Sequence, residues 1–275
     1  METGGFYVNR KARFSSAKNY ALYYGCGGAN QLTQYDIAIV EPSGHSADSI
    51  LEMKSSGTLV IAYLSVLEIP PWSEDLGRLK TRDLLHLNGQ PYLNQEFGNF
   101  WVDLRSSRWV NLLLERVDYL LDKVGYDGLF LDTIGYVESR LLSSDLRNKL
   151  QSAAVKIICK IRKRFPKCLL IQNCGLEDLF KRTAGYLDGI CWENPPFNQL
   201  ASQAWAAQII CILEQEKKSH NLQVFLLVER NHLSAQDFYL VEKVAHDKQF
   251  LVYNAPTNYT DGVRINCQAF QTNNQ

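Results

Sequence analysis

Tyr126-Asp127-Gly128-Leu129-Phe130-Leu131-Asp132-Thr133 is the stretch that decides the fold of this chain. A glycine stands where backbones crowd, three apolar residues follow, and a carboxylate comes where the apolar run stops. A strand that is apolar throughout is typical of a parallel sheet covered by helices. An acid at the carboxyl end of such a strand lies on the rim where α/β folds place their chemistry, so Asp132 is a candidate functional residue. The alternative is that Asp132 caps the next helix or holds a loop.

Seven further apolar runs repeat this pattern along the chain. They occupy residues 20–25, 35–42, 59–68, 168–173, 187–193, 224–229 and 250–254. Most are separated by segments with helical periodicity, of which 109–124 and 146–165 place their apolar residues on one face. Eight short strands alternating with helices is the pattern of a (β/α)8 barrel. We therefore predict an α/β protein with one TIM-barrel domain over residues 20–267, a flexible N-terminal tail over 1–19 and a C-terminal tail over 268–275.

One connection is unusually long. Residues 69–100 separate the third strand from its helix, although connections in α/β units usually have about 2–6 residues. A long loop on the carboxyl face of a barrel predicts a lid or a binding wall.

Composition limits the partners and the setting. The 275 residues carry 29 basic and 29 acidic side chains, which indicates no attraction to nucleic acid or to an anionic membrane. No apolar run approaches the roughly 20 residues of a membrane helix. The seven cysteines form no CxxC pair and are typical of a reduced protein. Without a visible secretion leader we expect a cytoplasmic protein, or a secreted one whose leader is not part of this sequence. The oligomeric state stays open.

Acids terminate five of the eight predicted strands. They are Glu41, Glu68, Asp132, Glu193 and Glu229. One such acid is usually a helix cap or an ion-pair partner, but like charges gathered at one mouth repel and raise one another's pKa. We therefore predict a functional cleft at this rim.

Three chemistries fit an acidic cleft. Glycoside hydrolysis needs two carboxyl groups, one protonated and one ionised. Three acids could instead hold a divalent metal ion, which takes oxygen ligands. The third is recognition of a cationic ligand without bond cleavage.

Other barrel chemistries are disfavoured. No lysine ends a strand, which argues against a Schiff-base aldolase. His45 and His232 are the histidines near the rim, and we interpret both as loop residues. No glycine occurs between Gly189 and Gly262, so the glycine-supported phosphate site common after the last two strands is not indicated, and no GxSxG elbow is present. We predict no cofactor.

Aromatic side chains accompany the acids at the predicted rim. They are Tyr24, Tyr63, Trp72, Trp101, Tyr136, Trp192 and Tyr253. Sugars present flat C–H faces to aromatic rings, while carboxylates and amides bind their hydroxyl groups. Trp192 and Trp72 are the predicted platforms, and Asn173, which ends the fifth strand, is a candidate ligand for a sugar hydroxyl. We assign substrate binding to Tyr24, Glu41, Tyr63, Glu68, Trp72, Asn173, Trp192, Glu229 and Tyr253.

A series of motifs resembles glycoside hydrolase family 114, the endo-α-1,4-polygalactosaminidase-like barrels. In order they are YDIAIVEP (35–42), VIAYLSVLE (60–68), WVD (101–103), YDGLFLDT (126–133), LIQN (170–173) and LDGICWEN (187–194). The resemblance runs from about Tyr20 to Tyr253. Two positions differ: Leu67 replaces the usual glycine of an SVGE motif, and Glu41 replaces an aspartate.

The resemblance implies a catalytic pair of Asp132 and Glu193. It implies a retaining route, with Asp132 as nucleophile and Glu193 as general acid/base, on polymers that carry free amines. An acidic rim would attract such a sugar, which supports the same substrate class independently. We therefore predict a metal-independent endo-acting hydrolase of amino-sugar polysaccharides. The alternatives are a non-catalytic barrel that binds sugars or cations, and a divalent-metal-dependent lyase or hydrolase.

Overall fold

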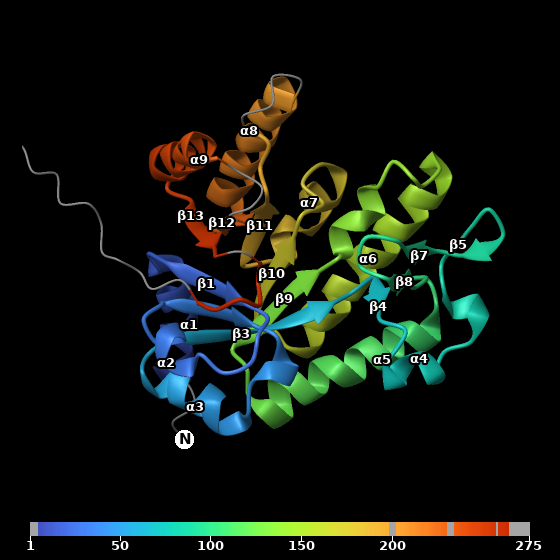
Figure 1. The fold of residues 1–275 in the computed structure, drawn as a ribbon, viewed down its shortest axis with the longest axis horizontal. Coiled ribbons are helices and arrows are strands. Elements are labelled where there is room, and N and C mark those ends of the chain that lie inside the picture. The colour runs from blue at the N-terminus through green and yellow to red at the C-terminus, as the bar shows by residue number, and fades with distance from the viewer. Residues whose placement is uncertain (1–4, 198–201, 230–233, 257, 264–275) are drawn as a thin grey trace, which may run out of the picture.

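Eight parallel strands form the centre of the molecule (Figure 1), a computed structural model that describes residues 5–197, 202–229, 234–256 and 258–263. Hydrogen-bonded neighbours follow the order β1-β2-β3-β9-β10-β11-β12-β13. Their bounds are Tyr20–Tyr23 (β1), Ile37–Val40 (β2), Leu59–Ser65 (β3), Gly128–Asp132 (β9), Leu169–Asn173 (β10), Gly189–Glu193 (β11), Gln223–Glu229 (β12) and Leu251–Ala255 (β13). The last strand returns to the first, where the rings of Tyr20 and Tyr253 lie 5.7 Å apart. This nearly closed, single-domain barrel confirms the predicted fold and all eight predicted strands.

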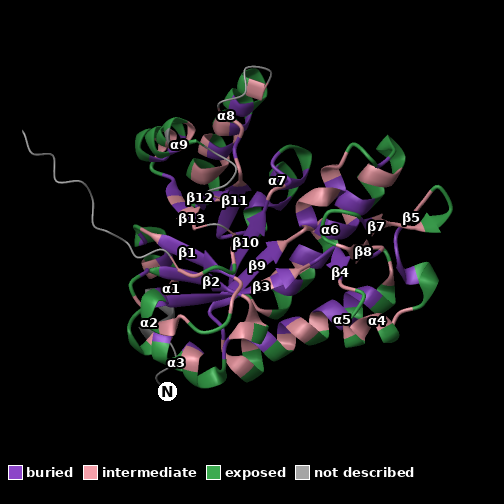
Figure 2. Ribbon diagram, viewed as in Figure 1, coloured by how far each residue is buried: buried purple, intermediate pink, exposed green. Residues whose placement is uncertain are grey.

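Helices surround the barrel, and the buried residues concentrate in the strands and on the inner helix faces (Figure 2). The helices are Gly5–Ser16 (α1), Ala29–Leu32 (α2), Ala47–Ser55 (α3), Glu74–Gly77 (α4), Ser107–Asp118 (α5), Ser144–Arg164 (α6), Asp178–Thr183 (α7), Gln203–His220 (α8) and Ala235–Lys248 (α9). A serine caps α3, α5, α6 and α9 by accepting a hydrogen bond from the backbone near the helix start. No described helix is long and apolar enough to cross a membrane.

Glycines begin the two strands that carry the predicted catalytic pair. A Cβ atom on Gly128 would lie 2.3 Å from the carbonyl oxygen of Leu169, and one on Gly189 would lie 2.7 Å from the ring of Phe225. Neither position has space for a side chain, so these glycines allow β9 and β11 to pack into the barrel.

The predicted flexible tail over residues 1–19 is wrong for residues 5–16, which form α1. Phe14 is buried with its ring centroid 5.8 Å from that of Phe225. Gln223 Nε2 donates hydrogen bonds to the carbonyl oxygens of Phe14 and Ser15 at 3.1 and 2.7 Å. The segment carries Arg10, Lys11 and Arg13 and no acid, and its other anchors are aspartates far along the chain. The predicted C-terminal tail lies outside the described residues.

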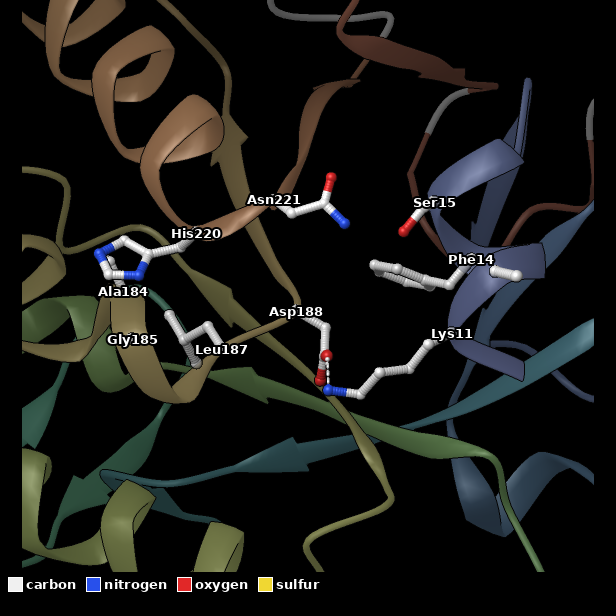
Figure 3. A pocket seen from close by; sticks show the side chains of 10 residues that line it. Lys11, Phe14, Ser15, Ala184, Gly185, Leu187, Asp188, His220 and Asn221 are labelled. Carbon is white, nitrogen blue, oxygen red and sulfur yellow. Dashed lines mark ion pairs between the residues drawn. The ribbon is translucent and has the colours of Figure 1, made fainter. Parts of the chain in front are cut away.

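Those aspartates stand at the amino ends of β9 and β11. Asp127 forms ion pairs with Arg10 at 3.0 Å and Lys54 at 3.3 Å, and it accepts a hydrogen bond from the Val60 backbone at 3.0 Å. Asp188 repeats the arrangement, with Lys11 at 3.0 Å and Arg162 at 2.5 Å. Figure 3 shows the Lys11–Asp188 ion pair beside a cavity of about 400 Å³ under the barrel. The basic residues of α1 thus connect it to both strands.

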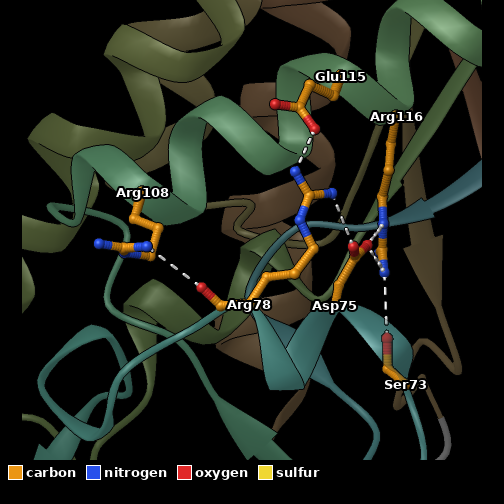
Figure 4. A network of polar contacts seen from close by, with 6 residues as sticks. All are labelled: Ser73, Asp75, Arg78, Arg108, Glu115 and Arg116. Carbon is orange, nitrogen blue, oxygen red and sulfur yellow. Dashed lines mark hydrogen bonds and ion pairs between the residues drawn. The ribbon is translucent and has the colours of Figure 1, made fainter.

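The long connection after β3 is largely folded. It contains the short strands Glu68–Ile69 (β4), His86–Leu87 (β5), Gln90–Pro91 (β6), Leu93–Asn94 (β7) and Asn99–Trp101 (β8), of which β4, β8 and β7 form an antiparallel sheet. Figure 4 shows how it is held: Asp75 accepts from Arg116 Nε at 2.7 Å, and Arg78 bridges Asp75 to Glu115. These contacts tie the connection to α5, as expected if it forms a rigid wall of the binding cleft.

Candidate active site

Three adjacent strands bring polar side chains together at their carboxyl ends. Asp132, Asn173 and Glu193 are the last residues of β9, β10 and β11, which are neighbours in the barrel. Asn173 Nδ2 donates to Asp132 Oδ1 at 2.7 Å and to Glu193 Oε2 at 2.9 Å. One amide nitrogen therefore connects the two predicted catalytic acids.

This shared nitrogen limits the distance between the acids. The two accepting oxygen atoms cannot be further apart than the two hydrogen bonds laid end to end, about 5.6 Å. Retaining glycosidases have carboxyl groups about 5–5.5 Å apart, whereas inverting ones leave about 6.5–9.5 Å for a water molecule. The pair has the closer spacing.

A tyrosine accompanies each acid. The Tyr259 hydroxyl donates to Glu193 Oε1 at 2.6 Å. Burial raises the pKa of Tyr63 well above its usual value, and the charge of Asp132 and a hydrogen bond with it add to the shift. The ring of Tyr24 lies between these two, with centroids 4.6 Å from Tyr63 and 5.5 Å from Tyr259. Aromatic rings thus enclose the pair.

The environment of Glu193 favours its protonated form. Burial raises the pKa of this carboxyl, and the charge of Asp132 raises it further, while the hydrogen bonds from Tyr259 and Asn173 oppose the shift. The charge of Glu229 adds a smaller increase in the same direction. Burial and the charge of Glu193 also raise the pKa of Tyr259, so the tyrosine is a neutral donor. A protonated Glu193 beside Asp132 could donate a proton.

The backbone is unusual directly after all three strand ends. Thr133, Cys174 and Asn194 have φ angles of 59°, 56° and 45°, a region that residues other than glycine seldom adopt. Thr133 Oγ1 accepts hydrogen bonds from the backbone of Leu67 at 2.8 Å and Val66 at 3.1 Å, which ties the ends of β9 and β3 together. These turns stop each strand at its polar residue.

The other three predicted rim acids have different environments. Glu41 caps a 3₁₀ turn (Pro42–Gly44) by accepting a hydrogen bond from the Ser43 backbone at 3.3 Å.

Glu68 is buried in β4 and accepts hydrogen bonds from Asn94, Asn99 and Trp101 at 2.7, 3.1 and 2.9 Å. It organises the loop sheet, so its assignment to substrate binding is wrong. Glu229 ends β12 and lies close enough to Glu193 to influence its pKa.

The predicted aromatic platforms are partly wrong. Trp192 is only 2 % exposed, because alternation along β11 points its side chain outward, where it contacts Trp205 of α8. Tyr253 is buried against Tyr20 and Tyr35 in the core. Trp72 is 77 % exposed on the loop after β4. Trp101 is buried and stacks on Tyr136 with centroids 5.2 Å apart.

Two remaining predictions concern single residues. Leu67 is fully buried, so the side chain that replaces the usual glycine lies in the core and does not line the cleft. His45 is buried, with its pKa lowered by burial. His232 lies outside the described residues.

Sequence reasoning missed Tyr259 and Trp205. Tyr259 follows the last strand, and its carbonyl oxygen accepts a hydrogen bond from the Tyr24 backbone at 2.7 Å, which brings it over the mouth. No strand-end rule marks a residue in that segment. Trp205 lies in the first turn of α8, and no strand-end pattern marks a residue in a helix.

No group of three or more His, Cys, Asp and Glu side chains suited to a metal ion is found within the described ranges. Two acids bridged by an amide, with a tyrosine at each, can instead supply a proton donor and a nucleophile.

Comparisons with known proteins identify the family and the fold. The model of glycoside hydrolase family GH114 matches residues 8–194. No curated protein sequence matches significantly. The glycoside hydrolase domain of PelA from Pseudomonas aeruginosa has a similar structure (TM-score 0.72, 18 % identity, 91 % of this chain and 99 % of that one). Ega3 from Aspergillus fumigatus, solved in complex with galactosamine, is also similar (TM-score 0.68, 15 % identity, 90 % and 93 %). The α-galactosidase TtGalA from Thermus thermophilus shares the fold more distantly (TM-score 0.58, 16 % identity, 84 % and 57 %). The chain belongs to glycoside hydrolase family GH114.

Proposed function

We propose that the protein is an endo-acting glycosidase that cleaves α-1,4-linked galactosamine polymers with retention of configuration. The observation that carries this proposal is the single amide nitrogen of Asn173, which bonds both acids and so holds them at the spacing of a retaining pair.

The two acids have unequal roles. Glu193, whose pKa is raised by burial and by Asp132, is the proton donor to the glycosidic oxygen. Asp132 attacks the anomeric carbon, and the C–O bond to the leaving sugar breaks as the Asp132 ester forms. Glu193, now ionised, then takes a proton from water, and the resulting hydroxide equivalent displaces Asp132 from the sugar.

The charge of the mouth supports a cationic substrate. Neither Asp132 nor Glu193 forms an ion pair with a lysine or arginine of the described chain, and their hydrogen-bond donors are neutral. An ammonium group on the sugar would supply the missing positive charge. The galactosamine named with Ega3 belongs to this class of ligand.

The test is hydrolysis of partly deacetylated α-1,4-galactosamine oligomers, followed by the release of reducing ends with and without EDTA. We expect cleavage that the chelator does not affect. Activity abolished by EDTA and restored by Mg²⁺ would support a metal-dependent enzyme instead, and binding of the oligomers without cleavage would support a non-catalytic receptor.

A further inference from the structure

An exposed tryptophan and a carboxylate form a pair in the segments that follow β10 and β11, the strands that end in Asn173 and Glu193. Trp205 lies in the first turn of α8 and is 36 % exposed. Its indole Nε1 donates to Glu177 Oε1 at 2.7 Å. Glu177 is exposed in the segment between β10 and α7, and no ion pair joins it to a cation among the described residues. The pair therefore presents an aromatic surface next to a negative charge that no cation of the described chain neutralises.

The pair is connected to the catalytic centre through Trp192. The indole of Trp205 meets that of Trp192 edge to face, with ring centroids 5.7 Å apart and an interplanar angle of 87°. Phe197 contacts Trp192 in the same way at 5.1 Å. Trp192 directly precedes Glu193 in β11, so Trp205 packs against the residue next to the proton donor, from the opposite face of the strand. This packing fixes the orientation of the exposed indole.

The chemistry of the pair suits a sugar that carries an ammonium group. A sugar ring lies with its C–H face on an aromatic ring, and a cation is attracted both to an indole face and to a carboxylate. A neutral N-acetylated sugar would keep the stacking but lose both charge interactions. An anionic sugar would be repelled by Glu177.

We propose that Trp205 and Glu177 form an outer subsite that recognises a free amino sugar of the polymer while another unit of the same polymer occupies the catalytic pair. This proposal rests on the proposed function and makes it more specific. Trp205 supplies the stacking surface, and Glu177 selects the deacetylated unit. The hydrogen bond between them keeps the carboxylate at the edge of the ring.

Binding tests this subsite without requiring hydrolysis. Calorimetry would measure the Kd of α-1,4-galactosamine oligomers for an E193Q protein and for the same protein carrying W205A or E177Q. The amide oxygen introduced by E177Q can still accept from the indole, so this change removes the charge and keeps the contact. We expect each added change to weaken binding about 2- to 30-fold, the range of a cation–π contact. E177Q should have no effect on fully N-acetylated oligomers.

Two matched controls accompany these variants. D178N removes a carboxylate one residue away that pairs with Lys181 at 4.0 Å, and Y119A removes an exposed aromatic ring from the π-helical segment (Tyr119–Val124) that continues α5. Both should leave the Kd unchanged. Equal loss in D178N and E177Q would overturn the subsite in favour of a general effect of charge.

The outcomes separate this proposal from the proposed function. If wild type cleaves the oligomers and W205A and E177Q bind them as well as E193Q alone, the subsite is refuted and the glycosidase stands. If wild type is inert but binding depends on Trp205 and Glu177, the subsite stands and the proposed catalysis fails. Absence of binding in every variant would overturn the subsite.

Discussion

Strands β9 and β11 carry an acid at each end, and the two ends differ in what surrounds that acid. At the amino ends, Asp127 and Asp188 pair with basic side chains of α1, α3 and α6. At the carboxyl ends, Asp132 and Glu193 share one neutral amide and lie near tyrosines. An acid neutralised by cations serves the fold, whereas burial beside a second carboxylate raises the pKa of Glu193 and makes it a candidate proton donor.

The largest expected difference is in activity. D132N and E193Q should lower kcat by about 10²–10⁴-fold, because each removes a group that acts in the transition state. D127N and D188N should retain kcat within a few-fold, since their acids are at the opposite ends of the same strands. Reducing-end assays on galactosamine oligomers measure all four. A comparable loss of kcat in a folded D127N protein would contradict the division between the two ends.

The next difference is in stability. In D127N an amide nitrogen replaces one of the two carboxylate oxygens, so either the Val60 backbone or the Arg10 and Lys54 side chains lose their acceptor. An unsatisfied buried hydrogen-bonding group costs about 1–3 kcal/mol, so the free energy of unfolding should fall by that amount. Urea denaturation followed by circular dichroism provides the measurement. An unchanged midpoint would show that α1 is not anchored through this carboxylate.

Removing charge at the mouth should have the opposite effect on stability. The folded-state pKa of Glu193 is raised, so this group favours the folded state at low pH, and that contribution is lost as pH rises through the folded pKa. At neutral pH, E193Q removes the free-energy cost of ionising this buried carboxyl. Tm should therefore rise at neutral pH, by about 2–4 °C for each kcal/mol gained. The gain should disappear below the unfolded pKa of glutamate, about 4.3. If the Tm difference between E193Q and wild type did not depend on pH, it could not come from the raised pKa of Glu193.

The smallest expected effect distinguishes the two tyrosines. The Tyr259 hydrogen bond lowers the pKa of Glu193, so Y259F should raise that pKa and move the alkaline limb of kcat/KM to higher pH. Y63F removes a contact of Asp132 and should leave the alkaline limb in place. If the alkaline limb of kcat/KM moved by the same amount in both variants, the two tyrosines would not act on different acids.

The strands and the catalytic pair could be predicted from sequence because both depend on local pattern. Apolar runs mark buried parallel strands, and Asp132 and Glu193 stand where two of them stop. Glu68 also follows an apolar run, but Val66 and Leu67 separate it from the end of β3. Glu68 therefore belongs to β4 of the loop sheet and not to a barrel strand. Position after an apolar run does not determine which way the chain then turns.

Contacts between distant segments could not be predicted in this way. The α1 helix depends on ion pairs with Asp127 and Asp188, more than a hundred residues along the chain. The place of Trp192 beside Glu193 predicts a ring at the mouth, but alternation places it behind β11, and Trp205 from α8 is the exposed ring instead. The partners of such residues become visible only when the tertiary arrangement is known.

The stereochemistry of cleavage tests the central claim most directly. Proton NMR of the first products released from an α-1,4-galactosamine oligomer, recorded before mutarotation, reports the configuration of the new reducing end. The distance set by Asn173 between Asp132 and Glu193 predicts the α-anomer, formed with retention. A β-anomer as the first product would show that a water molecule attacks directly and that Asp132 is not the nucleophile.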